Sequence, residues 1–550
     1  MITLDATEDK IVVTGAPGWA HGVFNGIPAA SFRRNETWWY PRSPFSAGRL
    51  VRRLSENDMD TGIGTTATER FTHLSKQMET FLYRASSEAK MRPVEYLTST
   101  SPWNHQREAS NWLSGRPYAY LAMRMGTGKT LTAINEILIR EPRRTLILCP
   151  KSVIDVWLDE FSVHAWQSDH LLTPLNKGSS KYKAEMAAAK WCDALKMRRP
   201  HVVIVNYETA WREQVAKWIL DDYRPEVIIA DEGHKLKAPG SRVSKFAAKL
   251  FRYSDFRLLL SGTPLPNNQM DSFGQYRFMD PGIFGTNFSR FRARYAEVQS
   301  FKGFPEIVGW RNQEEFRHIL KLTMFRVDED VLDLPSITHI QRRCNLPSKA
   351  QRVYDRLMTS FVADVESGEV TAGNALVRLL KFQQITSGFI TDDEGGLTDL
   401  HNEKQQMLED IVDGVAGEPV VVFCRFRRDL ESVKEVAEKH GRCYREVSGD
   451  RNDLERGKIP RGTGVLGVQI AAGGVGVNLN ASRICVFYSL GFSLAEYEQA
   501  VARLHRGGQK SAVTVYHLIA RNTVDQRVYQ ALADKKRVVD EIMNYVKGIQ

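Results

Sequence analysis

The chain has 550 residues, too many for one hydrophobic core, and this length predicts about two to four domains. Its hydrophobic fraction of 42% and charged fraction of 25% are those of an ordinary soluble globular protein, and no apolar run is long enough to span a membrane. The net charge of +10 and the pI near 9.1 favour a polyanionic partner and a merely solubilising basic surface about equally.

The start of the chain and its cysteines indicate a reducing compartment. Residues 1–5 show neither the basic nor the apolar segment of a secretion signal. The six cysteines are scattered singly, without a C-x-x-C pair, so we expect neither a zinc site nor a disulfide framework. We therefore predict a cytoplasmic protein.

Residues 1–92 differ from the rest because they show no alternation of strands and helices. They contain the aromatic tract Thr37–Pro44 and a helical stretch near Glu69–Ala85. Trp38, Trp39 and Tyr40 could stack on bases while nearby arginines, Arg33, Arg34, Arg42 and Arg49, hold phosphates. The alternative, which we favour, is that these aromatic residues form the core of a small domain.

From about Arg92 to Pro335, short β-rich runs alternate with helical patterns, as a parallel sheet requires. The predicted strands are Tyr118–Ala122, Thr145–Cys149, Val202–Val205, Val227–Ala230 and Arg257–Leu260. Loops at the carboxyl ends of such strands are where ligands bind.

The loop after the first of these strands predicts a phosphate-binding site. It reads Met123 to Thr130 and ends in Gly128-Lys129-Thr130, ahead of a helical pattern. Lys129 would bind the β- and γ-phosphates, and Thr130 would place its hydroxyl on Mg²⁺. Met123 stands where the first glycine of the usual pattern belongs, so the match is incomplete.

Asp231-Glu232 follows the strand Val227–Ala230, about a hundred residues after the phosphate loop. Two adjacent carboxylates at the end of a strand suit magnesium chemistry, although a lone Asp-Glu pair is more often a surface turn. We expect Asp231 to hold Mg²⁺ and Glu232 to orient and deprotonate the attacking water.

A second alternating set runs from about Gln341 to the C-terminus. Its predicted strands are Val420–Phe423, Cys443–Val447, Val465–Gln469, Arg483–Tyr488 and Val513–Leu518. Near its end, Arg503 and Arg506 are spaced to share one helical face, and guanidinium groups can stabilise charge on a γ-phosphate.

An ordered series of motifs spans roughly residues 100 to 535. Its members are 104–106, 125–130, 148–152 with Trp157 and Phe161, 205–208, 231–237, 260–264 with 267–268, 422–424, 472–479 and 499–509. In this order and spacing the chain resembles the Swi/Snf-type branch of superfamily 2 helicase-like ATPases. Because the long insertions of large chromatin remodellers are absent, it is most similar to compact bacterial or viral members. The first ninety residues look faintly like the HARP accessory domain of annealing helicases.

The resemblance implies an α/β fold with two RecA-like parallel-sheet lobes, an interlobe ATP cleft and a small N-terminal α+β accessory domain. The implied domains are residues 1–92, 93–338 and 339–550. Implied cofactors are ATP and Mg²⁺. Implied partners are double-stranded or branched DNA and a replication, recombination or transcription protein, with the chain a monomer in a prokaryotic cell or virus-infected host.

The resemblance also assigns roles to residues. Catalysis falls to Lys129, Asp231, Glu232, Arg503 and Arg506; nucleotide binding to Gln106, Met125, Gly126, Thr127, Gly128, Lys129, Thr130, Gly474 and Gly476; and Mg²⁺ binding to Thr130 and Asp231. Coupling falls to His234, Ser261, Gly262, Thr263 and Gln509, and contact with the DNA backbone to Lys151, Asn206 and Arg425.

The implied activity is ATP-driven translocation on duplex DNA, which remodels DNA structures or protein–DNA complexes in repair or recombination. Two alternatives remain. One is an ATP-gated nucleic-acid clamp or recruitment factor. The other is a strand-separating helicase, which would need a wedge element that the sequence does not reveal.

Overall fold

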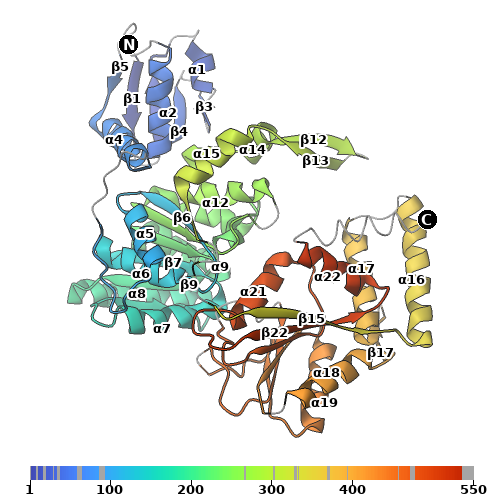
Figure 1. The fold of residues 1–550 in the computed structure, drawn as a ribbon. Helices are drawn as coiled ribbons and strands as arrows, with labels where there is room; N and C mark the ends of the chain where they lie inside the picture. Colours follow the sequence, from blue (N-terminus) through green and yellow to red (C-terminus); the bar gives the residue numbers. More distant parts are fainter. Residues whose placement is uncertain are drawn as a thin grey trace. The chain divides into compact units, whose positions relative to one another are not determined.

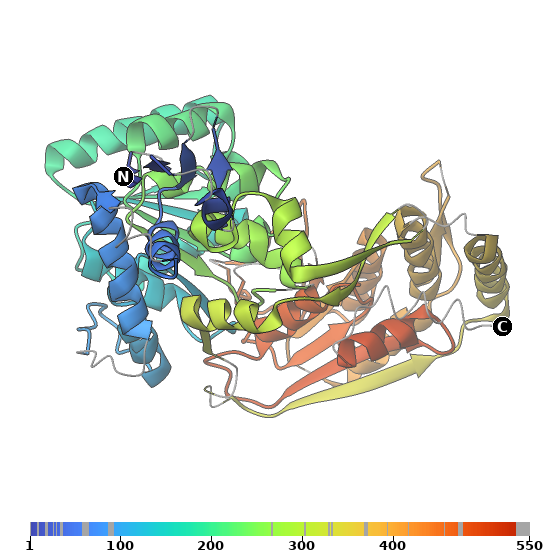
Figure 2. The same ribbon diagram turned by 90° about the horizontal axis from the view of Figure 1, so that it is seen from above.

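The computed structural model describes residues 2–7, 10–16, 20–25, 27–28, 30–33, 37–57, 65–85, 93–265, 268–301, 304–327, 331, 334–367, 372–392, 394–415, 417–455, 457–470 and 477–534. The chain forms two compact units, Met1–Val331 and Leu332–Gln550. Each contains a parallel sheet with helices on both faces (Figures 1 and 2). Within the described ranges, no helix combines the length and apolarity needed to cross a bilayer.

The first unit begins with a small α+β module, here called the N-terminal module, whose sheet has the order β3-β4-β2-β1-β5. Its elements are β1 (Ile2–Ala6), β2 (Lys10–Thr14), α1 (His21–Asn25), β3 (Ser31–Phe32), β4 (Trp38–Pro41), α2 (Pro44–Ser55), β5 (Thr65–Ala67) and α4 (Glu69–Ala85). The predicted helix near Glu69–Ala85 is confirmed. Alternate residues of β1 and β2 are buried against the helices, as the two-residue period of a strand requires.

The aromatic tract divides between the two faces of this sheet. Trp38 and Tyr40 are buried in the module's core, as we favoured, and the Tyr40 hydroxyl donates to the Phe24 carbonyl oxygen at 3.0 Å. Trp39 points to the other face, where Lys10 Nζ lies 3.2 Å and Arg33 Cζ 4.4 Å from its ring centre. Arg34 lies outside the described residues.

The N-terminal module is docked on the rest of the first unit through α2. Arg49 Nη1 donates to the carbonyl oxygens of Gly282 and Ile283 at 2.7 and 2.9 Å. The rings of Phe45 and Phe81 pack against Tyr118 with centroids 6.1 and 5.4 Å apart. The prediction that Arg49 could hold a phosphate is therefore wrong, because its guanidinium is committed to this contact.

The large sheet of the first unit has seven parallel strands in the order β14-β6-β11-β10-β7-β9-β8. Their bounds are β6 (Tyr118–Met123), β7 (Arg144–Cys149), β8 (Leu171–Pro174), β9 (His201–Asn206), β10 (Val227–Asp231), β11 (Phe256–Leu260) and β14 (Met324–Val327). All five predicted strands are confirmed. The strands β8 and β14 were not predicted, because each of these four-residue edge strands has a single buried residue and so no run of buried positions.

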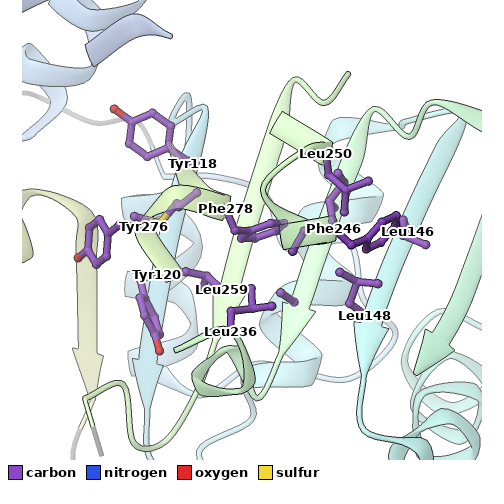
Figure 3. Close-up of a cluster of buried hydrophobic side chains, with 14 of the residues drawn as sticks. Tyr118, Tyr120, Leu146, Leu148, Leu236, Phe246, Leu250, Leu259, Tyr276 and Phe278 are labelled. Carbon is purple, nitrogen blue, oxygen red and sulfur yellow. The ribbon is translucent and has the colours of Figure 1, made fainter. Parts of the chain in front are cut away.

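Helices bury both faces of this sheet, so its inner strands read as continuous apolar runs. Figure 3 shows one such interface, in which Tyr120, Leu148 and Leu259 of the sheet lie among side chains such as Leu236 and Phe278. The helices are α5 (Asn104–Leu113), α6 (Lys129–Arg140), α7 (Ile154–His164), α8 (Ser180–Met197), α9 (Tyr207–Ala210), α10 (Glu213–Lys217), α11 (Arg242–Ala247), α12 (Ser272–Met279), α13 (Pro281–Phe284), α14 (Phe288–Tyr295) and α15 (Gln313–Thr323).

Between α14 and α15 a two-stranded antiparallel ribbon, β12 (Ala296–Phe301) and β13 (Phe304–Trp310), extends away from the sheet (Figures 1 and 2). Its base is fixed by packed aromatic rings: Phe284 stacks on Phe316, and Tyr295 meets Phe316 edge to face, each with centroids 5.5 Å apart. Above the base, Val298 and Val308 are exposed. The sequence did not reveal this element, because the consecutive residues Glu297, Val298 and Gln299 of β12 are all exposed and give no alternation of buried apolar positions.

The second unit has a six-stranded parallel sheet in the order β15-β22-β21-β18-β20-β19. Its strands are β15 (Ile337–Cys344), β18 (Val420–Cys424), β19 (Tyr444–Val447), β20 (Val465–Gln469), β21 (Ile484–Phe487) and β22 (Val513–Ala520), and a small hairpin joins β16 (Phe389–Thr391) to β17 (Leu397–Asp399). Its helices are α16 (Ser348–Ser367), α17 (Ala372–Ser387), α18 (Glu403–Gly414), α19 (Arg427–Lys439), α21 (Leu494–Leu504) and α22 (Val524–Ala533). The five predicted strands are confirmed, whereas the polar edge strand β15 was not predicted.

Candidate functional site

The predicted phosphate loop joins β6 to α6 in the first unit. Gly126 and Gly128 adopt left-handed backbone angles, with φ of 82° and 81°. A side-chain carbon on Gly128 would lie 1.9 Å from Gln106 Nε2, so no larger residue fits there. The loop ends at the N-terminus of α6, where backbone N–H groups attract anions.

Gln106, predicted to bind the nucleotide, is hydrogen-bonded to this loop. Its Oε1 accepts from the backbone nitrogen of Trp103 at 2.9 Å, and its Nε2 donates to the Thr127 carbonyl oxygen at 3.1 Å. His105 Nε2 lies 2.8 Å from the same oxygen, and Thr127 Oγ1 donates to the Arg124 carbonyl oxygen. These bonds fix the turn that the two glycines allow.

Lys129 and Thr130 are the first two residues of α6. Lys129 Nζ donates to the carbonyl oxygens of Met123 and Arg124 at 2.8 and 3.2 Å, so its ammonium lies inside the loop. Met125 borders the loop that follows β11, because a carbon on Gly262 would lie 3.5 Å from the Met125 backbone nitrogen.

Asp231 is the last residue of β10, and Glu232 follows it in a left-handed conformation with φ of 52°. Both carboxylates are buried. Burial, together with the charge of Glu232, raises the pKa of Asp231 to about 6, while the charge of Lys129 acts in the opposite direction. Trp157 Nε1 donates to Asp231 Oδ2 at 3.0 Å, and the Tyr207 hydroxyl donates to the Asp231 carbonyl oxygen at 2.7 Å.

The predicted coupling residues of the first unit form a chain of contacts that starts at Glu232. His234 Nδ1 lies 3.3 Å from Glu232 Oε2 and 3.2 Å from Ser261 Oγ. Ser261 Oγ in turn accepts from the backbone nitrogen of Thr263 at 3.1 Å. The acidic pair is thereby connected to the loop after β11, which also borders the phosphate loop through Gly262.

The donor set fits Mg²⁺ held partly by a nucleotide. Among the described residues, no three His, Cys, Asp or Glu side chains gather as a cage for a metal ion. Mg²⁺ is typically bound through one or two carboxylates and substrate phosphates, so Asp231 and the Thr130 hydroxyl suffice as protein ligands. A cation would also relieve the repulsion that raises the pKa of Asp231.

In the second unit, the prediction that Arg503 and Arg506 share a helical face is wrong. The helix α21 ends at Leu504, so Arg506 lies in the following turn. Arg503 is only 2% exposed, and its Nη1 donates to the Val477 carbonyl oxygen at 3.5 Å. Arg506 is half-buried in that turn.

Gln509, predicted to couple nucleotide state to movement, holds the backbone around this turn. Its Nε2 donates to the carbonyl oxygens of Asn480, Ser482 and Leu504, and its Oε1 accepts from the backbone nitrogens of Lys510 and Ser511. Gly474 and Gly476, predicted to contact the nucleotide, lie outside the described residues.

The predicted DNA contacts differ in exposure. Lys151 is exposed just after β7, whereas Asn206, at the end of the neighbouring β9, is only 6% exposed and donates from Nδ2 to Glu208 Oε2. Arg425, after β18 of the second unit, is half-buried with its Cζ 4.4 Å from the Phe492 ring centre. Only Lys151 is fully presented to solvent.

The structure shows contacts near the site for three residues to which the sequence assigned no role. Trp157 donates to the carboxylate of Asp231 and Tyr207 to its backbone carbonyl oxygen, but nothing in the spacing of these residues indicates either contact. Lys183 Nζ donates to Thr209 Oγ1, and burial and then the charge of Lys151 lower the pKa of Lys183. Two lysines therefore gather at the carboxyl edge of the sheet.

Comparisons with known protein families support the assignment. The model of the SNF2-related domain matches residues 105–387, and that of the helicase conserved C-terminal domain matches residues 403–508. Together they cover the large sheet of the first unit and all strands of the second unit's sheet except β22 (Val513–Ala520). The resemblance to Swi/Snf-type ATPases is confirmed.

Three relatives illustrate the range of this family. The chain is 29% identical to putative protein p41 of Acyrthosiphon pisum secondary endosymbiont phage 1, over 78% of this chain and 95% of the relative. It is 25% identical to an uncharacterized ATP-dependent helicase of Mycoplasma pneumoniae, over 82% of this chain and 43% of the relative. It is 24% identical to the human DNA repair and recombination protein RAD54B, over 79% of this chain and 53% of the relative.

The chain thus spans nearly the whole phage protein but only about half of the two cellular relatives. The first family model alone covers more than half of the chain, and the second follows it in order. The chain therefore belongs to the SNF2-related family and is an ATP-hydrolysing enzyme of the helicase type.

Proposed function

We propose that the chain uses ATP hydrolysis to translocate on double-stranded DNA and thereby remodels DNA structures or protein–DNA complexes. The contact chain from Glu232 through His234 and Ser261 to Thr263 carries this proposal. It links the residue assigned to water activation with a loop outside the phosphate site. A hydrolysis step at one end can therefore change the conformation at the other.

Within the first unit, the chain's own groups have separate tasks in hydrolysis. The phosphate loop and Lys129 bind and neutralise the phosphates, while Asp231 and Thr130 would hold Mg²⁺, which would supply positive charge for the developing negative charge. Glu232 orients the attacking water and accepts its proton. Trp157 keeps the Asp231 carboxylate in place through its 3.0 Å bond.

DNA as the track is supported by charge and by relatives. The chain has a net charge of +10, and Lys151 and Lys183 lie together at the carboxyl edge of the sheet. Backbone phosphates are held by such lysines without regard to sequence. The relative RAD54B is a DNA repair and recombination protein.

Triplex displacement tests translocation directly. The protein should strip a labelled third strand from duplex DNA only with hydrolysable ATP, whereas a clamp should bind DNA and leave the triplex intact. Glu232→Gln should retain ATP binding and lose displacement, and the matched control Glu213→Gln, at an exposed position in α10, should behave like the parent. DNA-stimulated hydrolysis without displacement would contradict the proposal and favour the clamp.

The ribbon β12–β13 favours strand separation as a second candidate function. A lone two-stranded ribbon is marginal in water, and this one exposes Val298 and Val308 above a rigid aromatic base. Such an element could divide the strands at a DNA fork. Replacing residues 299–306 with a short glycine turn should abolish release of a labelled strand from a fork while triplex displacement persists. If strand release is unchanged, the ribbon is not a wedge.

A further inference from the structure

A cavity outside the proposed site lies at the opposite edge of the first unit's large sheet. It has a volume of about 860 Å³. Arg143, His170 and Pro200, which directly precede β7, β8 and β9, line it together with the C-terminal end of α8. The phosphate loop and Asp231 follow the carboxyl ends of strands, so this pocket at the amino ends is separate from them.

The rim of the pocket is basic. Its lining contains three arginines, Arg143, Arg198 and Arg199, and one acidic residue, Glu141. Arg143 and Arg198 are exposed, and neither takes part in an ion pair within the described part of the chain. Arg199 is held by a 2.7 Å bond from its Nε to the Asp169 carbonyl oxygen. The rim therefore presents guanidinium groups, which bind carboxylates in a planar, two-bond geometry.

The floor and surroundings of the pocket are apolar. Leu138, Trp191 and Ala194 form part of its lining. Leu97 and Leu195 line it and are also exposed. Trp166 and Met197 adjoin lining residues in the sequence, and they are 65% and 60% exposed. Large apolar side chains gathered around a pocket mark an interaction site on a soluble protein.

The backbone holds two rim residues in a costly conformation. Glu141 and Arg198 end α6 and α8 in the left-handed region, with φ of 47° and 55°. Such conformations of residues other than glycine cost free energy and are frequent where a site is built. The shape of the rim is thus set by the ends of two helices.

We propose that this pocket, here called the amino-edge pocket, binds an acidic segment of a partner protein that inserts an apolar side chain between the arginines. Arginine, tryptophan and methionine are enriched at protein interfaces, and a central apolar anchor supplies most of the binding energy. Nucleic-acid interfaces are more polar than this apolar surround. The exposed side chains extend beyond the pocket, so the occupant is larger than a small molecule. The proposal does not depend on ATP or DNA.

Fluorescence anisotropy with the full chain tests this proposal. The probe is a labelled peptide in which glutamates surround a Phe-Leu pair; one comparison peptide carries lysines for the glutamates, and another carries serines for the Phe-Leu pair. The acidic apolar peptide should bind, and each comparison peptide should bind at least about tenfold more weakly. Equal binding of the three peptides, or no binding, would overturn the proposal.

Charge reversal locates the binding. Arg198→Glu should weaken the acidic peptide by about tenfold or more, since the rim then repels it. Lys181→Glu makes the same charge change near the other end of α8, where Lys181 is 78% exposed, and should alter binding less than about twofold. Equal effects of the two variants would show general charge attraction and refute the pocket.

Two further measurements separate this proposal from the proposed function. Duplex DNA should not displace the peptide; displacement that is lost in Arg198→Glu would identify the pocket as a nucleic-acid site and overturn the protein assignment. DNA-stimulated hydrolysis should be the same in Arg198→Glu and the parent. If the protein did not displace the triplex strand but still bound the peptide, translocation would be refuted and the proposal for the amino-edge pocket would be unaffected.

Discussion

The phosphate loop of the first unit and the arginine-bearing turn of the second unit are built in different ways. In the first unit, β6, β11 and β10 are neighbours, so the sheet brings Lys129, Ser261 and Asp231 together although Lys129 and Ser261 are 132 positions apart in the chain. In the second unit, Arg503 lies at the end of α21 and Arg506 in the turn after it, where side-chain packing decides their positions. Residues at strand ends are positioned by the backbone hydrogen bonds of the sheet, whereas residues at helix ends are positioned by side-chain packing.

The largest expected effect is at the loop that the sheet places. Lys129→Ala should lower the ATP hydrolysis rate at least about 100-fold, because the ammonium lies inside the phosphate loop. The measurement is kcat with saturating duplex DNA. Lys177→Ala, at an exposed lysine, is the matched control and should retain the parent's rate. If Lys129→Ala retained hydrolysis, the phosphate loop would not be the site of ATP hydrolysis, and its comparison with the arginine-bearing turn would fail.

The two arginines of the second unit should separate into a functional and a structural residue. Arg506→Ala should lower kcat by about tenfold to 100-fold with little change in melting temperature, because the resemblance assigns Arg506 to the transition state. Arg503→Ala should instead destabilise the second unit by about 3 kcal/mol, because Arg503 is buried against Val477. The measurements are steady-state kinetics and thermal unfolding. The distinction fails if both variants lose the same rate at unchanged stability.

Both units use a buried glutamine to hold the motif loop, and this similarity gives a smaller effect. Gln509→Ala and Gln106→Ala should each cost about 1–3 kcal/mol, since each removes the Oε1 that accepts from backbone N–H groups, those of Lys510 and Ser511 in the first variant and that of Trp103 in the second. Hydrogen exchange should quicken around Ser482 in the first variant and around Thr127 in the second. An equal increase over the whole chain in either variant would show global rather than local loosening.

The smallest effect concerns Glu136 in α6. Burial raises the pKa of Glu136 to about 7, while Arg140 opposes the shift. Because this folded-state pKa exceeds the ordinary value of 4.5, the side chain's contribution to stability is full below pH 4.5 and is lost as the pH rises through about 7. Glu136→Gln should remove this loss.

Urea unfolding of the Glu136→Gln variant at pH 5 and pH 8 provides the measurement. The variant should be more stable than the parent at pH 8 by on the order of 1 kcal/mol, and the difference should shrink at pH 5. Glu185→Gln, an exposed position in α8, should show no such pH dependence. A gain that is equal at both pH values would exclude titration of Glu136 as the cause.

The distinction between positions set by the backbone and positions set by side-chain packing also explains how far the sequence could predict the structure. Inner strands such as Val227–Asp231 and Val420–Cys424 were found because both faces are buried and the residues form apolar runs. The loop around Gly126 and Gly128 was found because its residue types are required by its backbone. The edge strand Ile337–Cys344 escaped because its side chains are mostly polar and partly exposed.

Contacts between distant side chains were beyond prediction. The bond from Trp157 to Asp231 joins residues 74 positions apart, and the contacts of Arg49 with Gly282 and Ile283 join residues more than 230 apart. The burial of Arg503 depends on the path of the chain around Val477 and Leu479. These features follow from tertiary packing, which leaves no local periodicity.

The docking of the N-terminal module has a consequence for anyone who dissects this protein. The family match begins at residue 105, which invites expression of a fragment without the first ninety residues. Such a truncation would uncover Tyr118 and remove Ser43, which bonds to the fully buried carboxyl of Asp280. A shortened enzyme would thus expose aromatic surface that the N-terminal module covers in the full chain. If the fragment were insoluble, this exposure would explain it, and the result would not be evidence about ATP hydrolysis.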